Sequence, residues 1–195
     1  ETFFVNLSGG TGYTVTGSTL VATGTIINDD TAPTIVIGSP SLVEGVSAST
    51  NLMFTVTSSV VSGLDVVVNY TTSNSTAISG VDYVASSSSV TINFNVAVNG
   101  DSLYEIDETF FVTLSGGSGY STTGSTLSAT GTITNDDIAP IITLGDVSFA
   151  EGNSGTSNMT FTIAASTVSG ADIVVNYSST DISATAGSDF TTGRG

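Results

Sequence analysis

The sequence repeats itself at a constant offset. The segment ETFFVNLSGG at residues 1–10 recurs as ETFFVTLSGG at residues 108–117, so Glu1 aligns with Glu108 and the offset (108 minus 1) is 107 residues. The two copies stay aligned without a gap to the end of the chain, and about half of the paired residues are identical. Solenoid repeats have shorter periods, of about 20 to 50 residues. A unit this long can hold its own core, and the repeat therefore predicts folded modules in tandem.

The repeat divides the chain into three parts. Residues 1–30 form the C-terminal part of one module, residues 31–137 a complete module, and residues 138–195 the N-terminal part of a third. Each junction has a proline, Pro33 or Pro140, and almost no linker, so we expect neighbouring modules to touch end to end and form a rod. Because the chain opens on Glu-Thr-Phe-Phe without a Met, we expect its N-terminus to be an internal cut or a processing site.

Apolar and polar residues alternate along the complete module, as expected of strands with one buried face. Leu52, Phe54 and Val56 alternate with Met53. A second segment shows the same pattern at Ile92, Phe94 and Val96, and a third shows it at Phe110 and Val112 on either side of Phe111. The predicted strands cover residues 34–43, 50–58, 64–72, 83–86, 89–98, 108–115 and 126–134. Seven short strands without helical periodicity predict an all-β fold of tandem antiparallel Greek-key β-sandwich modules with immunoglobulin-like architecture.

The composition excludes most catalytic chemistry. The chain has one basic residue, no His and no Cys. A Ser-His-Asp triad, a cysteine nucleophile, a P-loop lysine and a His or Cys zinc site cannot be built from it, and we predict that the protein is not an enzyme. A formal net charge of -16 would repel a phosphate backbone, so no nucleic-acid partner is expected. The apolar runs are far shorter than the roughly 20 residues that span a bilayer, so no membrane insertion is expected.

The carboxylates of the complete module are unevenly placed. Eight of the nine lie after the first strand, after the third or fourth, between the fifth and sixth, or after the seventh. They are Glu44, Asp82, Asp101, Glu105, Asp107, Glu108, Asp136 and Asp137, and Asp65 is the ninth. Ends of alternate strands emerge at the same pole of an antiparallel sandwich, so these groups should converge where the next module begins.

Several carboxylates at one pole need a compensating cation, because like charges at short range disfavour mutual ionisation. The module has no Lys, Arg or His to supply it. Oxygen ligands on flexible loops favour Ca²⁺ over transition metals, and Mg²⁺ fits so carboxylate-rich a site less well. An alternative is that these acidic loops are simply solvated.

Four segments carry a family resemblance. They are Glu44-Gly45, Gly80-Val81-Asp82-Tyr83, the segment from Gly100 to Phe110, and the closing segment from Gly131 to Asp137. Together they resemble the Calx-beta domain, in particular the tandem repeats of bacterial extracellular proteins. The resemblance covers the complete module and both partial ones. Family members in sodium/calcium exchangers bind regulatory calcium, whereas other members have adhesive or structural roles.

The resemblance implies a set of calcium ligands. In the complete module they are Glu44, Asp82, Asp101, Glu105, Glu108, Asp136 and Asp137, with Asp107 left out as a solvent-facing side chain. In the partial modules the corresponding residues are Glu1, Asp29, Asp30, Glu151 and Asp189. Exchanger modules have richer acidic clusters in the closing segment, whereas Asn135 precedes only two aspartates here. One or two structural ions are therefore expected, rather than cooperative sensing.

These features predict a structural or adhesive extracellular repeat, part of a secreted stalk or fibre, with modules rigidified by Ca²⁺ at the acidic pole between them. The expected partners are neighbouring modules of the same chain, with head-to-tail or lateral self-association, and a glycan or protein ligand. The alternatives are an adhesin that binds through the glycine-rich loops carrying Tyr13 and Tyr120, a calcium-sensing regulatory domain, and a glycosidase acid pair at Glu105 and Glu108.

Overall fold

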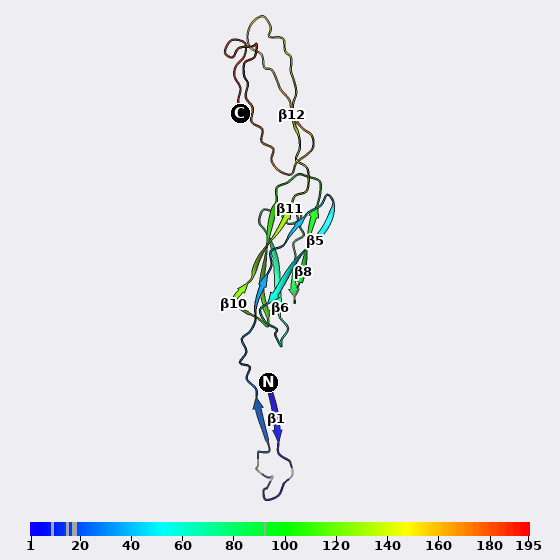
Figure 1. The fold of residues 1–195 in the computed structure, drawn as a ribbon, viewed down its shortest axis with the longest axis vertical. Coiled ribbons are helices and arrows are strands. Elements are labelled where there is room, and N and C mark those ends of the chain that lie inside the picture. Colours follow the sequence, from blue (N-terminus) through cyan, green and yellow to red (C-terminus); the bar gives the residue numbers. More distant parts are fainter. Residues whose placement is uncertain (9, 15, 17–18, 92) are drawn as a thin grey trace.

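The computed structural model describes residues 1–8, 10–14, 16, 19–91 and 93–195, and these residues form an elongated all-β molecule (Figure 1). A β-sandwich occupies the middle, and the two partial modules extend from its opposite ends. Ile92, predicted to lie in the core, is outside the described residues. Across the described ranges, no helix is long and apolar enough to cross a membrane.

Two sheets make the sandwich. The first has the strand order β10-β3-β5-β8 and the second has the order β4-β11-β9-β6-β7. The strands of the first sheet are β3 (Thr34–Ile37), β5 (Ala48–Ser58), β8 (Asn93–Gly100) and β10 (Ser121–Thr126). The strands of the second sheet are β4 (Ser41–Val43), β6 (Val67–Asn74), β7 (Ser87–Val90), β9 (Glu108–Ser118) and β11 (Ser128–Thr134). The sequence prediction of an all-β sandwich is confirmed.

The core follows from the alternation in the sequence. Phe54 and Phe110 have no exposed surface, whereas their neighbours Met53 and Phe111 are 55% and 43% exposed. Each neighbour points to the other face of its strand, as a period of two requires. Side chains from both sheets meet between them, where Phe54 stacks on Phe94 with ring centroids 5.4 Å apart and meets the edge of Phe110 at 5.9 Å.

One glycine makes room for this aromatic packing. A Cβ atom on Gly131 of β11 would lie 2.5 Å from Cζ of Phe110 and 2.9 Å from Cζ of Phe54, closer than packed atoms tolerate. Gly131 is paired with Phe110 across the β9–β11 ladder. The missing side chain therefore lets the Phe110 ring lie flat against the neighbouring strand.

The strand predicted over residues 34–43 is wrong as a single element. It divides into β3, antiparallel to β5, and β4, parallel to β11 in the other sheet. Pro40 lies in the break, where its ring restricts the residue before it and removes a ladder donor. The last predicted strand, over residues 126–134, corresponds to β11, which pairs with β9 and β4. The strand β10 before it was not predicted, and it pairs with β3.

The predicted strands over residues 83–86 and 89–98 are also corrected. Within the described residues, Tyr83 forms isolated bridges to Ser79 and Val98 but no strand, and the edge strand β7 covers Ser87–Val90 instead. β8 then begins at Asn93 in the other sheet. The run Ser86–Ser89 has no alternation from which a strand could be recognised.

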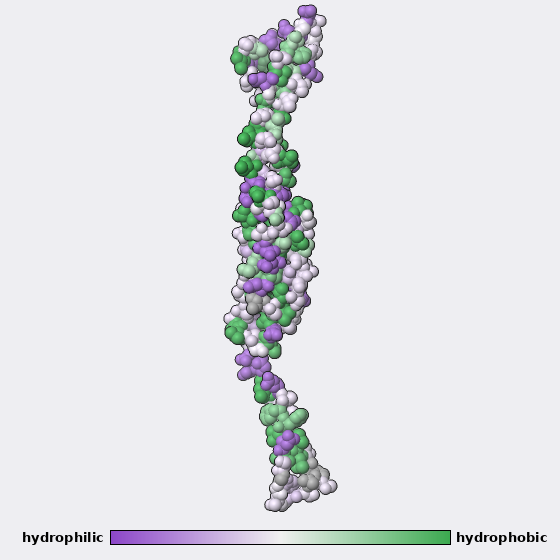
Figure 2. All heavy atoms as spheres, turned by 90° about the vertical axis from the view of Figure 1, so that its right-hand side faces the viewer, coloured by the Kyte–Doolittle hydropathy of each residue, from purple (hydrophilic) through white to green (hydrophobic). Residues whose placement is uncertain are grey.

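The partial modules keep the register of the complete one. In the first, β1 (Thr2–Asn6) pairs with β2 (Val21–Thr25), and the pair Phe3 and Gly24 repeats the pair Phe110 and Gly131. In the third, β12 (Ile142–Leu144) pairs with β13 (Ile163–Ala165) in the register of β3 with β5. Their apolar faces are exposed, as Figure 2 illustrates for the N-terminal hairpin at the bottom of the view.

Candidate metal centre

Glu44 meets the two closing aspartates through the pairing of β4 with β11. The parallel pair Val43 and Thr134 ends both strands at one level, and the Glu44 amide then donates to the Thr134 carbonyl at 3.2 Å. The next amide, of Gly45, donates to Oδ1 of Asp136 at 3.2 Å. Carboxylate oxygens of Glu44, Asp136 and Asp137 consequently lie within 4.8 Å of one another. We call these three residues the closing group.

A second group comprises Asp82, Glu105 and Glu108, which also place carboxylate oxygens within 4.8 Å of one another. Asp82 ends a tight turn in which Oδ2 accepts the Ile78 amide at 2.6 Å. Its own carbonyl accepts the Asn99 amide at 2.9 Å, which fixes the turn to β8. Glu108 begins β9, and Glu105 lies in the loop just before it. We call these three residues the turn group.

Two carboxylate oxygens at this pole are buried without a partner. Oε1 of Glu44 and Oδ2 of Asp137 are inaccessible and accept no hydrogen bond from the described residues. Glu44 as a whole is only 4% exposed. An ionised carboxylate in such a place carries a large desolvation cost unless a positive charge or a donor meets it. Both oxygens belong to the closing group, so the group has the character of a cation site.

The acidity of the glutamates reflects the same crowding. Burial raises the pKa of Glu44 to about 7, with further contributions from Glu105 and Asp101. The pKa of Glu108 is also raised to about 7. Burial is the largest cause, and the hydrogen bond to Asp82 and the negative charge of Asp82 are the next. The charge of Glu44 adds to the raised pKa of Glu108. The closing group and the turn group therefore form one electrostatically linked pole.

Asp101 lies beside the two groups without joining either. Its Oδ1 accepts the Leu103 amide at 2.7 Å, which closes a short turn. Its negative charge raises the pKa of Glu44, of Glu105 and of Asp137 in addition to the effect of burial. Six of the seven ligands implied by the family resemblance thus lie in the two groups, and the seventh is an electrostatic neighbour.

Asn135 has a role that the sequence analysis missed. Its Oδ1 accepts the Glu105 amide at 2.9 Å, and its Nδ2 donates to the Asp137 carbonyl at 3.0 Å. It therefore joins the loop of the turn group to the closing segment. Asp107 supports it, because Asp107 Oδ1 accepts the Asn135 amide at 3.1 Å. The sequence feature that could have indicated this role is the recurrence of the asparagine one repeat earlier, at Asn28. The Nδ2 of Asn28 donates to the Asp30 carbonyl at 3.4 Å.

The acidic residues of the partial modules are not gathered in this way. Across the described residues, Glu1, Asp29, Asp30, Glu151 and Asp189 take part in no group of three. Asp189 nevertheless repeats the turn of Asp82, because its Oδ2 accepts the Thr185 amide at 2.8 Å. The turn is therefore encoded locally, whereas the gathering of acids needs the complete sandwich.

The aromatic loop residue Tyr120 contacts its own module. Its hydroxyl donates to the Gly116 carbonyl at 2.6 Å, and its ring packs half-buried against the core. Tyr120 thus closes the loop between β9 and β10. Tyr13, its repeat equivalent, is 49% exposed.

Comparison with known proteins gives one family match. The sequence model of the Calx-beta domain matches residues 28–137 and 140–195. No curated protein sequence matches the chain. The crystal structure of an apo-form Calx CBD1 domain is similar at a TM-score of 0.40 and 22% identity, over 53% of this chain and 99% of that domain.

Two tandem structures are similar at the same identity. The CBD12 structure from CALX1.2 has a TM-score of 0.44 and 22% identity, over 61% of this chain and 53% of that one. The calcium binding domain CBD12 of CALX1.1 has a TM-score of 0.43 and 22% identity, over 55% of this chain and 46% of that one.

Proposed function

Because this chain belongs to the Calx-beta domain family, we propose that it is part of a calcium-rigidified tandem array with a structural or adhesive role outside the cell. The observation that carries the proposal is the pair of buried, unpartnered oxygens on Glu44 and Asp137. They belong to an acidic pole that lies directly before the next module begins at residue 138.

The donor set supports calcium in particular. Every candidate ligand is a carboxylate, and the chain has no Cys or His that would favour a softer metal. The carboxylates come from four separate segments rather than from one rigid element, and Ca²⁺ accepts six to eight oxygens in flexible geometry. The closing group and the turn group would hold one or two ions between them, with Asp101 as an additional oxygen source.

Bound calcium would act by neutralising the pole. It would allow Glu44 and Glu108 to ionise fully and would hold together four segments that otherwise repel one another. Asp137 is followed at once by Ile138, Ala139 and Pro140, so ordering the closing segment also restricts the path into the next module. The expected mechanical result is a joint whose stiffness depends on calcium.

An extracellular location accords with this mechanism. Extracellular calcium modules work with dissociation constants of about 10⁻⁴ to 10⁻³ M, which suit an ion that stays abundant and constant. The exposed Ser and Thr of the outer strand faces are compatible with a secreted chain. A stalk or fibre segment is the role that joins these features.

Thermal unfolding of the full chain tests the proposal. The melting temperature is measured in EGTA, across Ca²⁺ to millimolar concentration, and with Mg²⁺ as the ion control. It should rise with Ca²⁺ as mass action requires, and the rise should disappear in Glu105→Gln combined with Asp136→Asn. Asp65→Asn is the matched control, since Asp65 lies beside Leu64 at the opposite end of the sandwich. An unchanged melting temperature at millimolar Ca²⁺ would contradict the calcium part of the proposal and leave a plain structural spacer as the function.

A further inference from the structure

The third module contacts the complete module through a short loop, Ser169–Ala171. The Gly170 and Ala171 amides donate to the Tyr104 carbonyl at 3.0 and 3.2 Å, and the Ser169 hydroxyl donates to the same oxygen at 3.2 Å. Tyr104 and Ser169 also form an isolated parallel bridge. Three donors therefore converge on the carbonyl of the residue that precedes Glu105.

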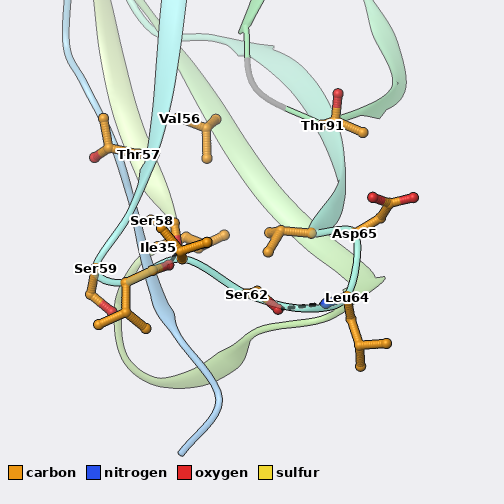
Figure 3. A pocket seen from close by; sticks show the side chains of 12 residues that line it. Ile35, Val56, Thr57, Ser58, Ser59, Ser62, Leu64, Asp65 and Thr91 are labelled. Carbon is orange, nitrogen blue, oxygen red and sulfur yellow. Dashed lines mark hydrogen bonds between the residues drawn. The ribbon is translucent and has the colours of Figure 1, made fainter.

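The loop is shaped in advance for this contact. The Ala171 amide donates to the Ser169 hydroxyl at 3.2 Å. One repeat earlier, the Leu64 amide donates to the Ser62 hydroxyl at 3.1 Å, as Figure 3 shows. Serine turns of this kind form from local sequence. The same turn is present with a contact at Tyr104 and without one, so contact is not what creates it.

Gly170 lies against the side chain of Glu105. A Cβ atom at position 170 would meet Oε1 of Glu105 and would come within 2.7 Å of its Cγ and 3.0 Å of its Cδ. Its repeat equivalent Gly63 (170 minus 107) has nothing within 4 Å of the corresponding point. A side chain at this position would therefore have to displace Glu105 where the loop has docked, and would displace nothing at Gly63.

The undocked copy of the loop borders an open hollow. The hollow has a volume of about 540 Å³ and is bordered by Ser59, Ser62 and Leu64 (Figure 3). Val60, Val61 and Leu64 around it are 56%, 100% and 75% exposed. This apolar surface stands at the pole opposite the acidic one, where a preceding module of the array would meet it.

We propose that Ser169–Ala171, with its equivalent Ser62–Leu64, is the docking element of the array, seated on the Tyr104–Glu105 segment of the module before it. Its partner is thus the acidic pole of another module of the same kind. Since Glu105 belongs to the turn group, docking holds this ligand in place, and docking and calcium binding stabilise each other. The coupling half of the inference rests on the proposed function, whereas the docking half rests on the contact alone.

Two matched glycine variants of the full chain test the inference. Gly170→Val should push the loop off Glu105, whereas Gly63→Val should meet no atom. Because the chain has no native Cys, spin labels can be placed at Met53→Cys and Val174→Cys, both exposed, to report the distance between the two modules. Calorimetric titration with CaCl₂ reports the affinity. Ser169→Ala provides a milder second variant, and near-ultraviolet circular dichroism checks that the sandwich remains folded.

Gly170→Val should broaden the distance distribution and weaken calcium binding by about fivefold or more, the usual lower range of coupling between sites. Ser169→Ala should shift the distance distribution and the calcium affinity in the same directions as Gly170→Val. Gly63→Val should leave the distance distribution and the affinity unchanged. Distance distributions that are equal in Gly170→Val and Gly63→Val would overturn docking. A broadened distribution with unchanged affinity would overturn the coupling. A wild-type chain that binds no calcium would end the proposed function, while the distances would still decide docking.

Discussion

Asn135 accepts the backbone amide of Glu105 at 2.9 Å, which joins the loop of the turn group to the closing segment across 30 residues of sequence. The same side chain donates to the Asp137 carbonyl, so one amide group spans the two groups of carboxylates. This relationship places a neutral residue at the centre of an acidic pole. Its contribution is to the positions of the ligands, not to their charge.

Asn135→Ala should therefore weaken calcium binding without removing a ligand. The substitution leaves the Glu105 amide without its acceptor, and a typical net hydrogen-bond contribution is about 0.5–1.5 kcal/mol, or a two- to tenfold change in affinity. Calorimetric titration measures it. Asn28→Ala is the control, because among the described residues Asn28 makes the equivalent bond to Asp30 and none to a glutamate amide. Equal losses in the two variants would contradict the bridging role.

The calcium-free chain should lose stability as pH rises from about 4.5 to about 7. Glu44 and Glu108 have folded-state pKa values of about 7 against an ordinary value of 4.5, so the folded chain binds more protons than the unfolded chain in this interval. Stability falls with pH wherever the unfolded state binds fewer protons. Urea unfolding in EGTA at a series of pH values measures the slope.

With saturating calcium the dependence should reverse, because the ion needs ionised carboxylates and competes with protons for them. Glu44→Gln should reduce the slope in EGTA. A calcium-free stability that rises between these pH values would contradict the crowded pole.

Gly131→Ala should destabilise the sandwich by about 1–3 kcal/mol, the usual cost of overpacking a core. The new methyl group would press on the rings of Phe110 and Phe54, which are both fully buried. Gly24→Ala is the matched control, since its neighbour Phe3 is 52% exposed and can rotate away. Chemical unfolding compares the two. A loss in Gly24→Ala as large as that in Gly131→Ala would show that core crowding is not the cause.

Ala48→Gly should stabilise the chain slightly. Ala48 has a φ of 68°, a left-handed conformation that costs a residue with a Cβ about 1–2 kcal/mol. Its repeat equivalent is Gly155, with a φ of 85°. Part of the gain is offset by the greater freedom of glycine in the unfolded chain, about 0.4–1 kcal/mol.

Ala97→Gly, in β8, should instead destabilise the chain, because Ala97 is not among the residues with positive φ. Thermal unfolding of the two variants side by side decides the point. A lower melting temperature for Ala48→Gly than for the wild-type chain would mean that the alanine is not strained.

The sequence predicts those features that depend on local pattern. Alternation identified the buried faces of β5, β8 and β9, and the placement of acids after alternate strands anticipated that Glu44, Asp82 and Glu105 would share a pole. The division of the strand over residues 34–43 was missed, because both halves are extended and only the tertiary pairing separates them. The roles of Asn135 and Gly170 were missed for the same reason, since each depends on a neighbour distant in sequence.

The parallel pairing of β4 with β11 has a mechanical consequence. The chain enters the sandwich at β3, at the end away from the acidic pole, and leaves it after β11 at the acidic end. Tension along a stalk would therefore draw β4, which follows β3 along the chain, and its partner β11 in opposite directions along their own axes. The hydrogen bonds between Ser41–Val43 and Thr132–Thr134 would then be loaded together in shear, not opened one after another, and the module would resist extension as a unit.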